Sequence, residues 1–198
     1  VFSDSVALSD LPESSLPLKY PTLSVKTLQN EYVLTETTAV AEFLVSQFDP
    51  KLAINSTCPN AYINYLFWKN YADASFMPNV ALKQIFAQII QKTPFIFRPI
   101  SWSFKFGFNK GYLNNAFKEQ LQRVNTHLAD NEWLSGSNFT IADVLMWFPL
   151  EACMHFAEIE SYTHLNRYMY QIHQRPSFQK ALQRGQWSNL EFIRYWSI

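Results

Sequence analysis

A proline inside an apparent strand is the first feature of this sequence that could do chemistry. Residues 16–23 read LPLKYPTL, and Pro21 falls where the pattern otherwise predicts a strand. Proline cannot donate to the hydrogen-bond ladder of a sheet, but a cis bond before it turns the chain at small cost. A cis Tyr20–Pro21 bond would turn the N–H and C=O groups of Tyr20 outward, where an extended peptide could pair with them.

A helix start follows shortly after this proline. Residues 34–44 read LTETTAVAEFL and pass from a strand end into an amphipathic helix, with Glu36 and Thr37 at the junction. The N–H groups and the positive dipole end of a helix start favour an anion such as a ligand carboxylate. Thr37 could add a hydroxyl donor, and Glu36 could bind a ligand ammonium group.

The same two stretches have a simpler alternative, in which a proline lies at a strand edge and a threonine caps a helix. Their order along the chain is nevertheless the order that a strand, a turn, a second strand and a helix require. We therefore expect a site here for a small molecule that carries a carboxylate.

The composition predicts a compact protein without a broad electrostatic partner. The chain has 198 residues, 48% of them apolar, and its 16 basic and 16 acidic residues balance, so we expect no nucleic-acid partner. It contains no run of 18 apolar residues and no N-terminal signal pattern, so we expect no membrane span and a cytoplasmic location. Its four glycines, two cysteines and four histidines form no phosphate-binding loop, no disulfide framework and no metal-ligand spacing.

Hydrophobic periodicity predicts a small sheet followed by helices. We expect strands over residues 20–25 and 31–35, joined by a polar turn, and a helix over residues 37–47. Residues 50–59 contain two prolines and read as a linker. Beyond the linker, the predicted helices cover residues 60–92 with a kink at Pro78, and then residues 112–129, 138–152, 165–173 and 176–184.

The stretch NFTIADVLMWFPLEA, residues 138–152, holds the sharpest local signal for a helix start. Thr140 lies at the N-cap position and Asp143 three residues later, which is a capping-box arrangement with aspartate in place of the usual glutamate. We expect these two residues to begin a buried helix and to take no part in chemistry.

One aromatic stretch, residues 95–108, does not read as a regular helix. Aromatic residues stand at positions 102, 104, 106 and 108, and this period of two indicates a strand. Because Arg98, Lys105 and Lys110 are interleaved, the stretch could also stack on nucleic acid or lie on a membrane surface. We favour a plainer role, as a connection between helices that lines a pocket or an interface.

Together these stretches resemble a known family. Residues 16–198 resemble a soluble glutathione S-transferase: LPLKYPTL is similar to the family's NPLGKVPVL, LTETTAVAEFL is similar to its strand-to-helix motif, and Thr140 to Asp143 match its helix-capping motif. The segments NYADASFMPNVALKQIF, PFIFRPI, FTIADVLMWFPLEA and RPSFQKALQRG are similar to the bacterial and fungal Gtt1-type transferases.

The resemblance implies a fold of two classes, α/β plus all-α. A thioredoxin-like domain that binds glutathione would cover residues 1–49, a linker residues 50–59, and an all-helical C-terminal domain residues 60–198. The implied activity is conjugation of glutathione, as a substrate, to small apolar electrophiles. The implied assembly is a homodimer that needs no metal.

The resemblance also implies roles for single residues. Tyr20 would bind the cysteinyl backbone of glutathione, Pro21 would be the cis proline, and Lys19 would reach the glycyl carboxylate. Glu36 and Thr37 would hold the γ-glutamyl end. The pocket for the apolar co-substrate would draw on residues of the predicted helix 60–92 and of the stretch after it: Tyr71, Phe76, Met77 and Phe95.

The sequence departs from the family at the position that matters most for catalysis. No Ser, Tyr or Cys can be assigned to activate the glutathione sulfur, and only about 20 residues precede the Pro21 strand, where a β–α–β unit needs roughly 30. We therefore expect an N-terminal domain that is incomplete in this chain. Two alternatives to a transferase stay open: a non-catalytic dimerisation or assembly module, as in some translation-associated proteins, and a carrier of apolar ligands.

Overall fold

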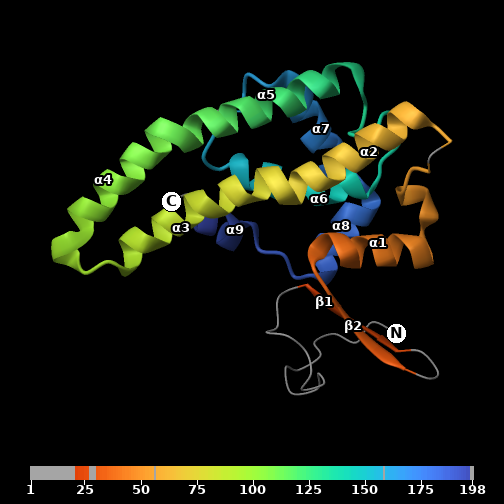
Figure 1. The fold of residues 1–198 in the computed structure, drawn as a ribbon, viewed down its shortest axis with the longest axis horizontal. Coiled ribbons are helices and arrows are strands. Elements are labelled where there is room, and N and C mark those ends of the chain that lie inside the picture. The colour runs from red at the N-terminus through yellow and green to blue at the C-terminus, as the bar shows by residue number, and fades with distance from the viewer. Residues whose placement is uncertain (1–20, 27–29, 56, 158, 197–198) are drawn as a thin grey trace. The chain divides into compact units, whose positions relative to one another are not determined.

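The computed structural model describes residues 21–26, 30–55, 57–157 and 159–196 (Figure 1). The chain divides into two compact units, residues 1–50 and residues 51–198. The described part of the first unit holds a two-stranded sheet and a helix, and that of the second unit is helical. The predicted fold class is confirmed: a partial thioredoxin-like unit is followed by an all-helical one.

In the first unit, strands β1 (Thr22–Lys26) and β2 (Glu31–Thr35) pair in antiparallel fashion, and helix α1 (Thr37–Phe48) follows β2 directly. The predicted strands and helix are therefore confirmed. The expectation that Pro21 lies inside the strand is wrong, because pairing begins at Thr22 and the proline precedes the ladder.

The second unit begins with a long helical rod. Helix α2 (Pro59–Tyr71) passes through a π-helical turn, η3 (Ala72–Phe76), into α3 (Met77–Lys92). A π turn of this kind widens a helix locally and commonly lies at functional positions. The predicted kink at Pro78 stays a prediction; the proline lies in the first turn of α3, directly after the π turn.

The chain then turns back and forms a second rod beside the first. A short 3-10 turn, η4 (Phe95–Phe97), leads into α4 (Arg98–Phe108), a π turn, η5 (Asn109–Leu113), and α5 (Asn114–Asp130). Helix α4 packs along α3, so the two rods make a helical hairpin (Figure 1).

The strand pattern over residues 95–108 is wrong, since these residues form η4 and α4. The aromatic residues at positions 102, 104, 106 and 108 form two pairs, 102 with 106 and 104 with 108, and the members of each pair are four residues apart along the helix. Trp102 and Phe106 stack four residues apart, with 5.5 Å between ring centroids and 13° between ring planes. The period of two thus arises from two interleaved pairs of helical neighbours.

The core of the second unit is built around α6 (Ile141–Cys153), which packs against α2, α7 and α9. Its capping box is formed as predicted: Asp143 accepts from the Thr140 N–H at 2.7 Å, and the Thr140 hydroxyl accepts from the Ala142 N–H at 3.3 Å. The helices that complete the unit are α7 (Thr163–His173), α8 (Pro176–Arg184) and α9 (Asn189–Trp196), the last of which was not predicted.

Candidate functional site

The strand register brings two predicted site residues to one end of the hairpin. Thr22 pairs with Thr35, so Pro21, which precedes the first, lies at the same end as Glu36, which follows the second. Both Pro21 and Glu36 are exposed. Residues 15 positions apart in the sequence are therefore neighbours at an accessible edge of the first unit.

Glu36 adopts a backbone conformation that is rare for any residue except glycine. Its φ of 75° and ψ of 123° lie outside the regions favoured by L-amino acids. Such a conformation costs about 1–3 kcal/mol and commonly occurs at functional sites. The strained residue here is also the first that leaves the strand, so its backbone sets the direction in which α1 begins.

The helix start itself is at Glu36, one residue earlier than the capping alternative suggests. The Val40 N–H donates to the Glu36 carbonyl at 2.9 Å, which makes Glu36 the N-cap and Thr37 the first helical residue. Thr37 is therefore not the N-cap residue. Its exposed hydroxyl lies in the first helical turn, next to N–H groups that precede the first helical hydrogen bond.

This end of the hairpin offers both kinds of partner that a zwitterionic ligand needs. N–H groups and the Thr37 hydroxyl in the first turn of α1 suit an anion, and the carboxylate of the exposed Glu36 suits a cation. The remaining two predicted glutathione residues, Lys19 and Tyr20, lie outside the described residues, as does the predicted cis bond before Pro21.

The four residues predicted to line an apolar pocket do not lie together. Tyr71 and Phe76 contact each other edge to face across η3, with ring centroids 6.4 Å apart, and Met77 follows directly. Phe76 has no exposed surface and belongs to the core, whereas Tyr71 and Met77 are partly exposed. Phe95 is 82% exposed in η4, which follows the C-terminal end of α3, whereas the other three lie at or before the start of that helix.

Sequence reasoning missed a polar groove beside Tyr71. The groove has a volume of about 350 Å³ and lies where the end of α2 and the start of α3 face η5 and α5. Its lining combines residues from these four segments: Tyr71, Asn79, Gly111, Tyr112, Asn115, Ala116, Glu119, Gln120 and Arg123. The spacing of Asn115, Glu119 and Arg123 at four-residue steps is the sequence signal that could have indicated this polar face.

Tyr71 has an unusual environment within the groove. Partial burial raises the pKa of the Tyr71 hydroxyl above its ordinary value, and the neighbouring Arg123 and Gln120 oppose this shift. The Arg123 guanidinium also lies over the Tyr71 ring, 5.9 Å from its centroid. Tyr71 is therefore a neutral hydroxyl that can donate or accept a hydrogen bond at neutral pH.

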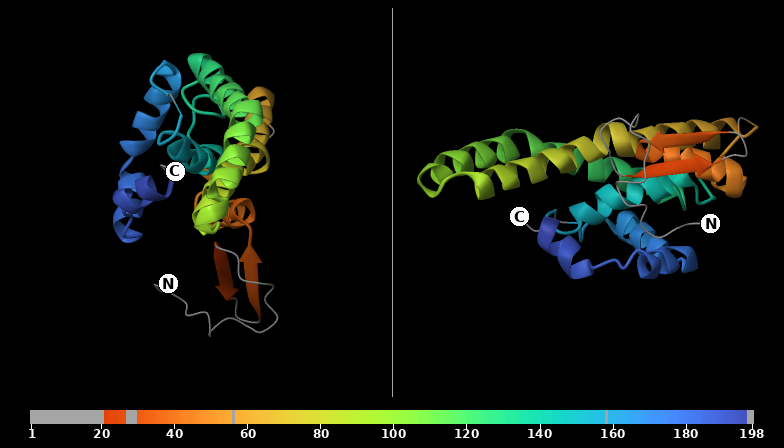
Figure 2. Two further views of the ribbon diagram at one scale, coloured as in Figure 1. Left: turned by 90° about the vertical axis from the view of Figure 1, so that its left-hand side faces the viewer. Right: turned by 90° about the horizontal axis from the view of Figure 1, so that it is seen from below.

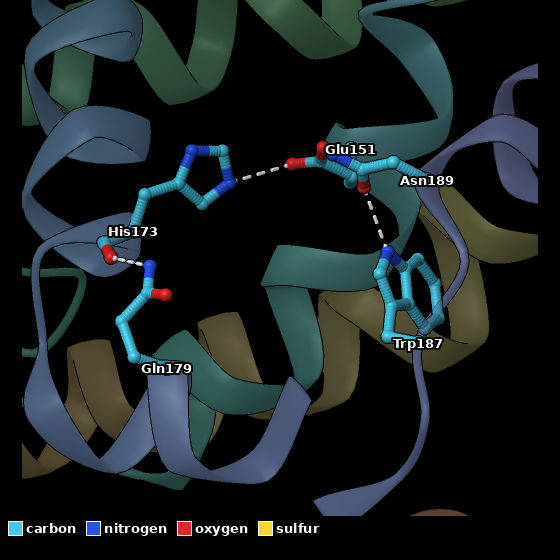
Figure 3. Close-up of polar contacts among 5 residues, drawn as sticks. All are labelled: Glu151, His173, Gln179, Trp187 and Asn189. Atoms are coloured by element: carbon cyan, nitrogen blue, oxygen red, sulfur yellow. Dashed lines mark hydrogen bonds and ion pairs between the residues drawn. The ribbon is translucent and has the colours of Figure 1, made fainter. Parts of the chain in front are cut away.

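A histidine–carboxylate pair near the C-terminal helices has a structural role. His173 on α7 lies 2.9 Å from Glu151 on α6, measured between Nε2 and Oε2, and the His173 carbonyl accepts from Gln179 at 2.7 Å (Figure 3). Nearby, the indole N–H of Trp187 donates to the side-chain oxygen of Asn189, the first residue of α9, at 2.8 Å. These contacts tie α6, α7 and α8 together.

The cysteines and acidic groups give no further catalytic centre within the described residues. Cys153 is fully buried, and burial raises the pKa of its thiol, so it stays protonated. Across the described ranges, no group of three or more His, Cys, Asp or Glu side chains is placed to hold a metal ion. The helices described also include none that is long and apolar enough to cross a membrane.

Comparison with known proteins gives matches over both units. Residues 97–176 match the family model described as "Glutathione S-transferase, C-terminal domain". Glutathione S-transferase 3 of Schizosaccharomyces pombe is 28% identical over 150 residues, which cover 75% of this chain and 62% of the relative. The chain thus spans less than two thirds of the length of that protein.

Two further matches differ in how much they cover. Elongation factor 1-gamma 2 of Oryza sativa is 40% identical over 73 residues, which are 34% of this chain and 17% of the relative. The crystal structure of glutathione transferase YghU from Streptococcus pneumoniae, complexed with glutathione, shares the fold at a TM-score of 0.65 and 19% identity, covering 83% of this chain and 61% of that one. This chain is therefore similar to glutathione S-transferases, through the family model over residues 97–176 and through the fission-yeast relative.

Proposed function

We propose that this chain binds glutathione at the end of the β1–β2 hairpin and conjugates it to small apolar electrophiles. The register of the hairpin carries the proposal, because it sets Pro21 beside Glu36 at an exposed helix start. The N–H groups and the Thr37 hydroxyl would bind the γ-glutamyl carboxylate, and Glu36 would bind the γ-glutamyl ammonium group. Tyr20 and Lys19 would hold the cysteinyl backbone and the glycyl carboxylate.

The reaction would proceed through the glutathione thiolate. The thiol loses its proton, and its sulfur then forms a bond to the electrophilic carbon of the co-substrate, which adds the nucleophile or releases a leaving group. A free thiol with a pKa near 8.5 is mostly protonated at neutral pH, so an enzyme of this kind must lower that value. The group that would do so is not assigned in this chain.

The co-substrate would bind to residues of the second unit. Tyr71 and Met77 are partly exposed next to the π turn η3, and Phe76 supports them from the core. The Tyr71 hydroxyl would orient polar groups of an electrophile, and Phe95, which lies beyond the far end of α3, is not part of this proposal. A homodimer, a cytoplasmic location and a role in detoxification complete the proposal, and all three come from the family resemblance.

Calorimetric titration of the full chain with glutathione tests the binding site. The double variant E36A/T37A should bind glutathione at least about tenfold more weakly, because each lost charge-assisted hydrogen bond is worth about 1.5–3 kcal/mol. E42A is the matched control, since it removes an exposed carboxylate from the same helix away from its start. Unchanged affinity in the double variant, or an equal loss in the control, would reject the site.

A second candidate function has one observation in its favour. The 73-residue match to elongation factor 1-gamma 2 is the observation behind a non-catalytic assembly module, without favouring it over the transferase. A conjugation assay with a generic aromatic electrophile separates the two functions. Glutathione-dependent turnover above the uncatalysed rate supports the transferase, whereas no turnover together with no glutathione binding supports the module.

A further inference from the structure

The tip of the helical hairpin, which consists of η4 and α4 (residues 95–108), exposes many large apolar side chains. None of the 11 residues of α4 is buried, and the 3-10 turn before it is exposed as well. The tip lies at the left end of the hairpin in Figure 1, away from α6, α7, α8 and α9. Seven of its large apolar side chains are at least 55% exposed: Phe95, Ile96, Phe97, Ile100, Trp102, Phe104 and Phe106.

One side of α4 faces α3 and the other side is wholly uncharged. Ser101 lies 3.0 Å from the Thr93 hydroxyl, and the Phe108 ring packs on Phe86 at 4.6 Å, so these positions face the first rod. At 100° per residue, the remaining arc of about 200° holds only apolar or small residues. They are Pro99, Ile100, Trp102, Ser103, Phe104, Phe106 and Gly107.

A shallow hollow runs along this outer side of α4. It has a volume of about 580 Å³ and is lined by Pro99, Ile100, Ser103, Phe104, Gly107 and Phe108. Beside it, the stacked rings of Trp102 and Phe106 form a flat apolar surface. The outer side of the tip is therefore broad. Phenylalanine, tryptophan and isoleucine dominate it, a composition typical of segments that lie at a membrane interface.

The charges around the tip are all of one sign. Between Asp73 and Glu119 the sequence has no acidic residue, although the whole chain has 16. The same interval holds six of the 16 basic residues: Lys83, Lys92, Arg98, Lys105, Lys110 and Lys118. The balanced net charge of the chain therefore conceals a cationic hairpin.

We propose that the hairpin tip docks on the surface of an anionic lipid bilayer. Trp102, Phe104 and their apolar neighbours would enter the boundary between headgroups and acyl chains. Lys92 and Lys110, both exposed, would lie near the headgroup phosphates and carboxylates. Apolar burial and attraction to a negative surface act together in such peripheral docking, and the helix lies in the plane of the interface.

The same charge pattern disfavours two other partners for this surface, a second copy of the chain and a single-stranded nucleic acid. A two-fold dimer through the tip would bring two cationic hairpins against each other, and like charges across an interface are unfavourable. A single-stranded nucleic acid needs cations that follow its backbone among the stacking rings. Here the stacking face carries no cation, since Lys105 lies on the side of α4 toward α3.

Vesicle co-sedimentation of the full chain tests the proposal. We expect binding to vesicles that contain about one third phosphatidylserine in phosphatidylcholine, weak binding to phosphatidylcholine alone, and loss of binding at high salt. W102S/F104S should lower partitioning more than about tenfold, because both large apolar contacts are lost. K92Q/K110Q should lower it by about fivefold for each cation removed.

Matched variants elsewhere on the surface serve as controls. L190S/Y170S removes two apolar side chains that are 81% and 65% exposed on α9 and α7, and K180Q/R184Q removes two exposed cations from α8. Both controls should bind vesicles as the wild type does. The proposal would be overturned by equal binding to neutral and anionic vesicles or by equal losses in the controls. It would also be overturned if W102S/F104S changed only the oligomeric state, or if the chain bound single-stranded RNA more tightly than vesicles.

Discussion

Asp143 at the start of α6 accepts a hydrogen bond from the hydroxyl of Tyr168 on α7, with 3.1 Å between Oδ1 and the phenol oxygen. The same carboxylate accepts from the N–H groups of Leu134 at 2.9 Å and Thr140 at 2.7 Å. One buried side chain therefore joins a loop, a helix start and a second helix. Its role is wider than the local capping box that the sequence predicted.

Replacing Asp143 with alanine should destabilise the protein strongly. Leu134, Thr140 and Tyr168 would each keep a buried donor without its acceptor, at about 1–3 kcal/mol apiece. We expect the free energy of unfolding in urea to fall by at least about 3 kcal/mol, while glutathione affinity of the folded fraction stays near that of the wild type.

D130A is the matched control for this change, because Asp130 is an exposed carboxylate at the end of α5. Its removal should change stability by less than about 0.5 kcal/mol. An unchanged melting temperature in the Asp143 variant would show that the carboxylate contributes little to folding.

The pH dependence of stability should also report on Asp143. Burial raises the pKa of this carboxyl from 3.8 to about 6, although hydrogen bonds from Leu134, Thr140 and Tyr168 pull it down. Between pH about 4 and about 6, the folded protein therefore holds a proton that the unfolded chain has released. Stability should be greatest below this window and fall as pH rises through it, by about 3 kcal/mol in total.

The variant D143N isolates this contribution, since asparagine has nearly the same size and does not titrate. We expect the wild type to lose stability relative to D143N as pH rises from about 4 to about 7, measured by urea unfolding at each pH. A relative gain over the same range would mean that the hydrogen bonds to the carboxylate outweigh its burial.

Local signals predicted the fold where they act within a few residues. The Thr140–Asp143 spacing located the start of α6, and the alternating strands with a polar turn located β1 and β2. Such signals depend on neighbours along the chain, so one sequence is enough to read them. They do not depend on the packing of the whole molecule.

The errors occurred where packing decides the structure. The aromatic residues at alternate positions indicated a strand in place of α4, because none of its residues is buried and its apolar residues fit both a strand and a helical spacing. The groove beside Tyr71 escaped notice because it needs the end of α2 and α5 side by side, about 50 residues apart in the sequence. The placement of Pro21 and Glu36 at one end of the hairpin also depends on a register that the sequence alone leaves open.

The strained backbone of Glu36 gives a way to separate its structural role from its proposed binding role. Glycine tolerates positive φ without a steric cost, whereas alanine does not. E36G should therefore protect the amides of α1 from hydrogen exchange at least as well as the wild type does, and E36A should keep the strain. Both variants lose the carboxylate, so both should bind glutathione more weakly.

Hydrogen exchange read by mass spectrometry over residues 37–48, together with glutathione titration, distinguishes the possible outcomes. If the side chain binds the ligand, affinity falls equally in E36G and E36A while protection of α1 differs between them. If only the backbone angle matters, E36A retains the wild-type affinity because it retains the wild-type geometry. If E36G protects the amides of α1 less than E36A does, the positive φ at position 36 carries no strain. The argument that marks Glu36 as a functional position would then lose its physical basis.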